Sequence, residues 1–358
     1  MPSIAPRFVP LATTLKIRVS IVFNWIKYRI TTISKYYVTE SRYPANLSFF
    51  TAAEQDLTSD TAIVIRGPII YDDNFTENTV EIYRALYPRA PIIISTWDYC
   101  QLQGEPIIND KNVHIVSLPF SRPKYGGTVN LQIQGNLAGI SLASKLGLRY
   151  VISTRADQRF YQPKLLKSFR AMINLFTYAH AGEGDHQTKR LITSSLDSFK
   201  YRLYGVSDMF VYGTIDDVYH YWNAPLISSV WGQKFHGPHY PESRQVIHRN
   251  PSYNSHRTYS YGRWSEIYIM TEYLRRNGVK ISWELKQYWQ ELGRRFIIVD
   301  SNSIGQFWPK YTWHENRWSD YCRQLEWKEV NHLEWLSFMR GDISLDGADK
   351  LCDNSIRF

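Results

Sequence analysis

The sequence is poor in cysteine and has no long apolar run. Three cysteines occur among 358 residues, at the widely separated positions Cys100, Cys322 and Cys352. A scattered, odd-numbered set argues against a disulfide framework and a cysteine-based zinc site, and it fits a reducing compartment. No apolar span of about 18 residues is present, so we expect no membrane-crossing helix. These absences predict a cytoplasmic protein.

The sequence also lacks the usual marks of nucleic-acid binding. It has no isolated run of Lys or Arg, and no helix-turn-helix, zinc-finger or RNA-binding signature. Internal repeats and low-complexity tracts are absent as well. The formal net charge of +9 therefore points to a different anionic partner, such as a phosphorylated substrate or a membrane surface, and not to nucleic acid.

Aromatic residues, in contrast, are abundant. The chain contains 26 Tyr, 16 Phe and 12 Trp, and its hydrophobic content of 44% is that of a globular protein. Rings interleaved with cations are dense near the C-terminus, where the segment 307–318 includes Trp308, Lys310, Trp313 and Arg317. Such rings serve either a carbohydrate-binding surface or core packing.

The first 58 residues differ from the rest and form a predicted basic and apolar extension. Residues 15–37 are apolar but are interrupted by Lys16, Arg18, Lys27 and Arg29. A segment of this kind can lie at the surface of an anionic membrane as a peripheral contact. It can equally be a helix that packs on the following domain with its charges in water.

From Thr61 onward the sequence predicts an α/β domain over residues 59–320, followed by a helical tail over 321–358. Short β-branched runs alternate with helical patterns, which is typical of a mostly parallel, Rossmann-like sheet flanked by helices. The strands are expected at 61–65, 92–95, 113–117, 147–159, 190–194, 206–213 and 296–300. The helices are expected at about 74–86, 130–146, 163–176, 265–277 and 283–292.

Three charged residues follow the strand that begins near Tyr150. Arg155, Asp157 and Arg159 come at alternating positions. In an open α/β sheet, ligands bind at the carboxyl ends of the strands, so these side chains are candidates for holding a metal and a diphosphate. A local ion network that closes the strand explains the same residues.

Other polar residues are expected at the same edge. Arg66 and Gly67 follow the first strand, and Gly67 allows close approach of a ligand to the backbone. Thr96 and Asp98 follow the second strand, where the Asp98 carboxylate can accept hydrogen bonds from a base or ribose, or can simply cap a turn. The helix after the third strand carries Asn130 and Gln134 on one face, either to contact a nucleotide or as solvated polar positions.

Two acidic residues are candidates for catalysis. Asp208 interrupts an apolar strand pattern, and a carboxylate in such a place is costly unless it has a partner or a function. Glu266 lies in the first turn of a predicted helix, where the helix dipole alone also favours an acid.

With these residues in view, the chain resembles the WavE-type lipopolysaccharide-synthesis family, which is similar to GT-A-type glycosyltransferases. The resemblance spans about residues 60–320. The matching segments are Arg66-Gly67-Pro68-Ile69, Asn74-Phe75-Thr76, Ser95-Thr96-Trp97-Asp98, the helix 130–139, Thr154 to Arg159, Ser207-Asp208-Met209-Phe210, Glu266 and Ile304 to Trp308 with Lys310-Tyr311.

The sequence departs from that pattern at two positions. Residue 66 is Arg where the family carries Gln. GT-A enzymes commonly bind a divalent metal with an Asp-X-Asp pair, whereas this chain has Arg155-Ala156-Asp157. Asp157 is then the single candidate ligand for Mn²⁺ or Mg²⁺, and the arginines can themselves neutralise a diphosphate.

The resemblance implies transfer of a sugar from a nucleotide-diphosphate sugar to a hydroxyl of a glycan or lipid-linked glycan, in lipopolysaccharide or other surface polysaccharide synthesis. Asp208, or else Glu266, would be the general base. The donor would be held by Arg66, Gly67, Thr96, Asp98, Asn130, Gln134, Arg155, Asp157 and Arg159. The alternatives are a sugar-phosphate nucleotidyltransferase and a carbohydrate-binding protein without enzymatic activity.

Overall fold

The computed structural model describes residues 55–100, 110–121, 127–180, 182–228, 265–282, 284–308 and 329–342. Most of the predicted N-terminal extension, the aromatic segment beyond Trp308 and most of the predicted C-terminal tail lie outside these ranges, so those predictions stay open. Within the described ranges, no helix is both long enough and apolar enough to cross a membrane.

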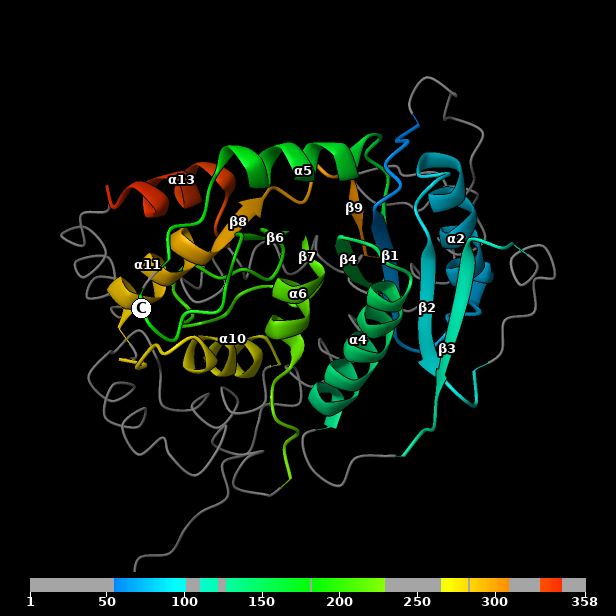
Figure 1. Ribbon diagram of the computed structural model, residues 1–358, viewed down its shortest axis with the longest axis horizontal. Coiled ribbons are helices and arrows are strands. Elements are labelled where there is room, and N and C mark those ends of the chain that lie inside the picture. The colour runs from blue at the N-terminus through cyan, green and yellow to red at the C-terminus, as the bar shows by residue number, and fades with distance from the viewer. Residues whose placement is uncertain are drawn as a thin grey trace, which may run out of the picture.

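The core of the molecule is one sheet of seven strands in the order β3-β2-β1-β4-β7-β6-β8 (Figure 1). The strands are β1 (Thr61–Arg66), β2 (Ile92–Trp97), β3 (Val113–Leu118), β4 (Tyr150–Arg155), β6 (Leu191–Ser194), β7 (Val211–Thr214) and β8 (Phe296–Val299). A mostly parallel sheet flanked by helices confirms the predicted α/β class and its GT-A-like arrangement.

One strand runs against the others. β7 is antiparallel to both of its neighbours, β4 and β6, while the remaining pairs are parallel. The sequence predicted strands over 147–159 and 206–213, but β4 ends at Arg155 and β7 begins at Val211. In both places polar residues leave the ladder to form turns at the edge of the sheet.

The helices of the described part are α2 (Phe75–Leu86), α4 (Gly127–Lys145), α5 (Leu165–Leu175), α6 (Ile215–Trp222), α10 (Ser265–Arg276), α11 (Leu285–Arg295) and α13 (His332–Arg340). A short 3-10 turn, Asp72–Asn74, precedes α2. Helix α6 was not predicted. At its start the Thr214 side chain accepts a hydrogen bond from the backbone N–H of Asp217, and the first turn contains acidic residues. Both features stabilise the beginning of a helix.

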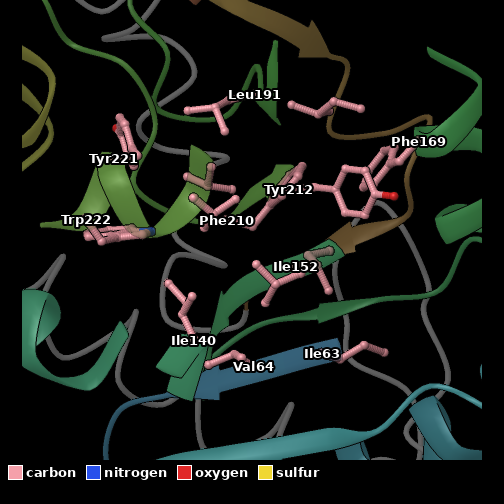
Figure 2. Packing of buried hydrophobic residues seen from close by; sticks show 14 of the residues in the cluster. Ile63, Val64, Ile140, Ile152, Phe169, Leu191, Phe210, Tyr212, Tyr221 and Trp222 are labelled. Atoms are coloured by element: carbon pink, nitrogen blue, oxygen red, sulfur yellow. The ribbon is translucent and has the colours of Figure 1, made fainter. Parts of the chain in front are cut away.

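Side-chain alternation along the strands assigns the helices to the two faces of the sheet. On one face α4 packs so tightly that a Cβ at Gly139 would lie 2.4 Å from Val64 Cγ1. On the other face the Phe169 ring of α5 stacks on Phe210, at 5.8 Å between centroids. Figure 2 shows these buried side chains between the layers. The tight contact fixes α4, and therefore the residues at its start, relative to β1.

Two short strands complete the fold beside the main sheet. β5 (Arg159–Phe160) pairs antiparallel with β9 (Gln306–Phe307). The pairing brings a segment from the C-terminal third of the described chain next to the end of β4.

Candidate active site

The carboxyl edge of the sheet gathers charged residues from distant parts of the sequence. Arg66 ends β1 and lies opposite Arg155, which ends β4, in the strand register. Asp208 comes just before β7, and because β7 runs in the reverse direction, its start lies at this same edge. The topology therefore brings the two guanidinium groups and this carboxylate to one edge.

Arg66 is buried, with 5% of its surface exposed, and its charge is only partly matched by neighbouring groups. Its Nη2 donates to the Asp208 backbone oxygen at 2.5 Å, and its guanidinium lies 4.9 Å from the centre of the Trp222 ring. Its Nε is buried and has no hydrogen-bond partner among the residues that the structure describes. Burial lowers the pKa of Arg66 to about 10, although the negative charge of Asp208 opposes this shift. An anion bound here would compensate the buried charge.

Arg155 and Asp157 form a bidentate ion pair. Arg155 donates from Nε to Asp157 Oδ1 and from Nη2 to Oδ2, both at 2.8 Å. Burial would lower the pKa of Arg155, but the adjacent Asp157 carboxylate raises it above its ordinary value. The guanidinium also lies 5.2 Å from the centre of the Trp308 ring. The pair is partly exposed, at 19% and 20% of the side chains, so a ligand can reach it.

Two buried carboxyl groups, those of Asp208 and Glu266, lie close to each other at this edge. The Ser265 hydroxyl donates to Asp208 Oδ2 and lies 3.4 Å from Glu266 Oε2. Glu266 Oε1 accepts a long hydrogen bond of 3.4 Å from Arg202. Burial and the negative charge of Asp208 raise the pKa of Glu266 to about 8, against the smaller opposing effect of Arg202. Glu266 therefore holds a proton at neutral pH.

Buried amide side chains connect the segments at this edge by hydrogen bonds. Gln158 donates to the Met209 backbone oxygen at 2.5 Å and accepts from Gln306 Nε2 at 2.8 Å. Gln306 in turn accepts from the Ser194 hydroxyl at the end of β6. This chain of hydrogen bonds joins β4, β6, β9 and the residues before β7, and it fixes the site residues to the scaffold.

Not all predicted site residues join this group. Arg159 is fully buried and donates to Thr79 Oγ1 at 2.7 Å and to the Phe75 backbone oxygen at 2.9 Å, on the face covered by α2. The chain turns after Arg155, and β5 directs the Arg159 guanidinium into the core, apart from Arg155; its contact with a diphosphate stays a prediction.

The two predicted residues on α4 differ in environment. The Asn130 side chain pairs both ways with the Ile227 backbone, accepting from its N–H at 2.8 Å and donating to its oxygen at 2.9 Å. This pairing engages both ends of the Asn130 amide, so its position favours a structural role over nucleotide contact. Gln134, one turn later, is exposed.

The predicted residues after β1 and β2 do lie at the edge. Gly67 has φ of +120°, a conformation that L side chains rarely adopt, and donates its N–H to the Ser95 oxygen at 3.0 Å. The Thr96 hydroxyl is buried and has no hydrogen-bond partner within the described ranges. Asp98 is exposed, and its Oδ1 accepts the Phe120 N–H at 3.1 Å, as a turn cap does. Their roles in donor binding stay predictions.

The described residues do not form an obvious metal site. No group of three or more His, Cys, Asp or Glu side chains within these ranges is arranged to hold an ion. Both oxygens of Asp157 accept from Arg155, so a cation at Asp157 would compete with a guanidinium for the same carboxylate. The residues present therefore do not fit a protein-held metal in this conformation.

Asp197 is a charged residue near the site that the sequence did not single out. It lies in the turn after β6, in the left-handed conformation with φ of +64°, and its N–H donates to Glu329 Oε1 at 3.1 Å. Burial and the Asp197 charge raise the pKa of Glu329 to about 8, and Asp197 also interacts electrostatically with Arg155 and Glu266. Its place after a parallel strand was the available signal, by the same rule that identified Asp98 and Asp157.

Comparison with known families identifies the chain. No curated protein sequence matches it. A family model described as WavE lipopolysaccharide synthesis matches residues 61–345, which include the whole sheet and every residue of the edge described above. That span is most of the chain, and a family of this description implies a biosynthetic enzyme. The protein therefore belongs to the WavE lipopolysaccharide synthesis family.

Proposed function

We propose that this protein is a glycosyltransferase that moves a sugar from a nucleotide-diphosphate sugar to a hydroxyl of a glycan acceptor. The family supports a part in lipopolysaccharide synthesis, and a GT-A-like sheet suits a nucleotide-sugar donor at its carboxyl edge. The site has a cationic side, Arg66 and Arg155, and an acidic side, Asp208 and Glu266. Sugar transfer needs both sides, because the nucleoside diphosphate leaves as an anion and the acceptor hydroxyl must lose a proton.

The observation that carries the proposal is the incompletely matched charge of Arg66. A buried guanidinium is costly unless an opposite charge or a full set of acceptors surrounds it. Arg66 has a backbone oxygen, an aromatic ring and an unpartnered Nε, but no salt bridge to a carboxylate of the described residues. A diphosphate bound at this edge would supply the missing negative charge and acceptors.

The reaction follows from the two sides of the site. Asp208 removes the proton from the acceptor hydroxyl, whose oxygen attacks the anomeric carbon of the donor. The bond between that carbon and the diphosphate oxygen breaks, and the electron pair leaves with the nucleoside diphosphate. Arg66 and Arg155 stabilise the charge that develops on the phosphate oxygens. Glu266, protonated at neutral pH, keeps a second negative charge away from the departing anion.

A divalent metal at Asp157 stays a separate proposal, and no step above passes through it. Mn²⁺ or Mg²⁺ would supply positive charge to the diphosphate if the donor brought the ion and Arg155 released Asp157. Titration of the donor complex with Mn²⁺ tests this. Affinity for the nucleoside diphosphate that rises with Mn²⁺ in the wild type but not in Asp157→Asn would support the ion.

The experiment for the proposed function is a thermal-shift screen of the full chain with nucleoside diphosphates. At ligand concentrations of about 100 times Kd, binding stabilises a protein by about 2.7 kcal/mol, which is readily measured. We expect one nucleotide to stabilise the wild type and to have little effect on Arg66→Met. If none of the nucleotides stabilises the wild type, a carbohydrate-binding protein without a donor site becomes the better interpretation.

Arg190→Met is the matched control for that screen. Arg190 is also a buried arginine, and burial lowers its pKa as well, but it lies just before β6, at the opposite edge of the sheet. Its guanidinium donates to the backbone oxygens of Arg294 and Thr177, at 2.7 and 2.8 Å. We expect this variant to lose stability without losing the nucleotide response. Equal loss of response in both variants would count against a specific role for Arg66.

A further inference from the structure

We propose that Ser265 is a positioning residue that favours Asp208 over Glu266, the other buried acid beside it, as the base of the reaction. This inference rests on the proposed function, in which a carboxylate takes the proton of the acceptor hydroxyl. It assigns to the first residue of α10 a role that goes beyond starting a helix.

The argument begins with the position of one hydroxyl between two carboxyl groups. Ser265 Oγ donates its only proton to Asp208 Oδ2 and lies 3.4 Å from Glu266 Oε2. Both acids are buried, at 6% and 8% exposure. Because a hydroxyl has a single hydrogen, it can stabilise the negative charge of one of the two acids at a time, and the shorter contact selects Asp208.

This contact also leaves one oxygen of Asp208 for the acceptor. The Oδ2 atom is engaged by Ser265, whereas Oδ1 has no hydrogen bond to any residue in the ranges that the structure describes. The Asp208 backbone oxygen accepts from Arg66, which fixes the main chain at this residue. Asp208 is therefore held at two points, and its second carboxylate oxygen is available to accept a proton.

The surrounding charges and the Ser265 hydroxyl act in the same direction. Arg66 and Arg155 both attract the Asp208 carboxylate, whereas Glu266 has one arginine near it, Arg202, among the described residues. Asp197, Tyr221 and Tyr288, from three other elements, also interact with these acids but donate no hydrogen bond to either carboxylate among the described residues. The hydroxyl of Ser265 adds a directional contact to this difference, because it gives its hydrogen bond to Asp208 and not to Glu266.

The test compares Ser265→Ala with Ser265→Thr in the full chain, by the pH dependence of nucleoside diphosphate release. Loss of the hydroxyl removes a hydrogen bond to a charged group, so we expect kcat in Ser265→Ala to fall by roughly ten- to hundredfold. The acidic limb of the profile should move to higher pH, because the base loses the hydrogen-bond donor that stabilises its negative charge. The KM for the donor should not change. Threonine should restore both kcat and the limb.

Two outcomes would overturn the inference: a Ser265→Ala profile that overlays the wild type, or a lower kcat with an unmoved limb that threonine does not restore. If alanine impairs folding, Ser265→Cys, a weaker donor of similar size, should give an intermediate limb.

A second measurement separates this inference from the proposed function. Infrared difference titration of the side-chain carboxyl groups reads their ionisation without turnover. With Glu266→Gln as the shared background, adding Ser265→Ala should change the carboxyl titration curve, and an unchanged curve would refute the role of Ser265. The proposed function fails separately, when the wild type shows neither nucleotide binding nor transfer.

Discussion

Each of the two edges of the sheet contains a buried arginine, and the charges of these two arginines are compensated to different extents by neighbouring groups. Arg295, just before β8 at the amino edge, has no exposed surface and donates to Asp185 at 2.9 Å and to Glu291 at 2.7 Å. Burial would lower the pKa of Arg295, but Tyr273, Asp185 and Glu291 raise it above its ordinary value. Among the described residues, Arg66, at the carboxyl edge, forms no ion pair: it donates to a backbone oxygen and lies over a ring, and burial lowers its pKa to about 10 although the Asp208 charge opposes this shift.

The comparison shows that burial alone does not identify a ligand-binding arginine. What distinguishes the two arginines is whether neighbouring carboxylates compensate the buried charge. The amino edge holds a completed ion network, with one nitrogen of Arg295, Nη2, left without a hydrogen bond but with two carboxylates balancing the charge. The carboxyl edge keeps a cation whose compensation is incomplete. An incomplete network of this kind costs stability in the free protein, and binding of an anion would recover it.

The largest effect expected from this comparison is on stability at the amino edge. Arg295→Met removes the cation that pairs with both Asp185 and Glu291; Glu291 keeps Arg294, but Asp185 loses its ion-pair partner among the described residues. We expect a loss of about 3–5 kcal/mol in the free energy of unfolding, as for other broken buried pairs. Urea denaturation measures it. A loss below about 1 kcal/mol would mean that the amino-edge network is not the structural support inferred here.

The second prediction is the opposite result at the carboxyl edge. Arg66→Met should lower kcat/KM for sugar transfer by about 10²–10³-fold, the usual cost of removing one donor to a developing anion. Its free energy of unfolding should stay the same or rise, because an incompletely matched charge is replaced by an apolar side chain of similar length. Steady-state kinetics and urea denaturation of the same preparation test both parts. A destabilised Arg66→Met with normal kinetics would remove the distinction between the edges.

The third prediction concerns pH. The pKa of Glu266 is raised from 4.5 to about 8, so its contribution to stability is present below about pH 4.5 and is lost as the pH rises to about 8. Glu266→Gln removes this loss. The variant should gain on the wild type between pH 5 and pH 8, by up to about 1.4 kcal/mol per pH unit for one proton. Thermal unfolding across this range measures it. Glu329, whose pKa is also raised to about 8, is unchanged in both proteins and cancels.

The smallest effect is expected at the partly exposed pair. Asp157→Asn should change the free energy of unfolding by less than about 1 kcal/mol, since ion pairs open to solvent contribute little. It frees Arg155, however, and the affinity for a nucleoside diphosphate should rise if Arg155 binds the anion without a metal. A weaker affinity in Asp157→Asn would instead favour the metal. Calorimetric titration distinguishes these results.

The sequence predicted the sheet because β-branched runs bounded by glycine, proline and charged residues mark buried strands without any knowledge of their partners. It also singled out Asp208, because a carboxylate inside an apolar run is conspicuous; the structure places this residue at the carboxyl edge, and its role in catalysis stays a prediction. The pattern was less informative for Arg159, whose spacing from Arg155 and Asp157 suggested one shared face. The turn after β4 and the pairing of β5 with β9 rotate it into the core, and that pairing joins Arg159 to Phe307, far along the chain.

Long-range contacts also explain what the sequence could not indicate at Asn130, Asp197 and Ser265. Asn130 bonds to Ile227, 97 residues away, and Ser265 bonds to Asp208, 57 residues away. Nothing in the sequence around Asn130 or Ser265 indicates these distant partners. Asp197 depends on a left-handed backbone conformation, which the sequence Ser194-Ser195-Leu196-Asp197-Ser198 does not reveal without a glycine.

Because β7 runs in the reverse direction, the residues of the site come from two kinds of segment: the ends of strands and the connection that leads into β7. Arg66 and Arg155 are the last residues of strands, so the backbone pairing of the sheet determines their positions. Asp208 instead precedes its strand, at the end of the connection from β6. Insertions or deletions in that connection can remodel the acid-bearing side while the strand ends stay in register. Relatives with different acceptors would then be expected to diverge between Ser194 and Asp208 and to keep the ends of β1 and β4.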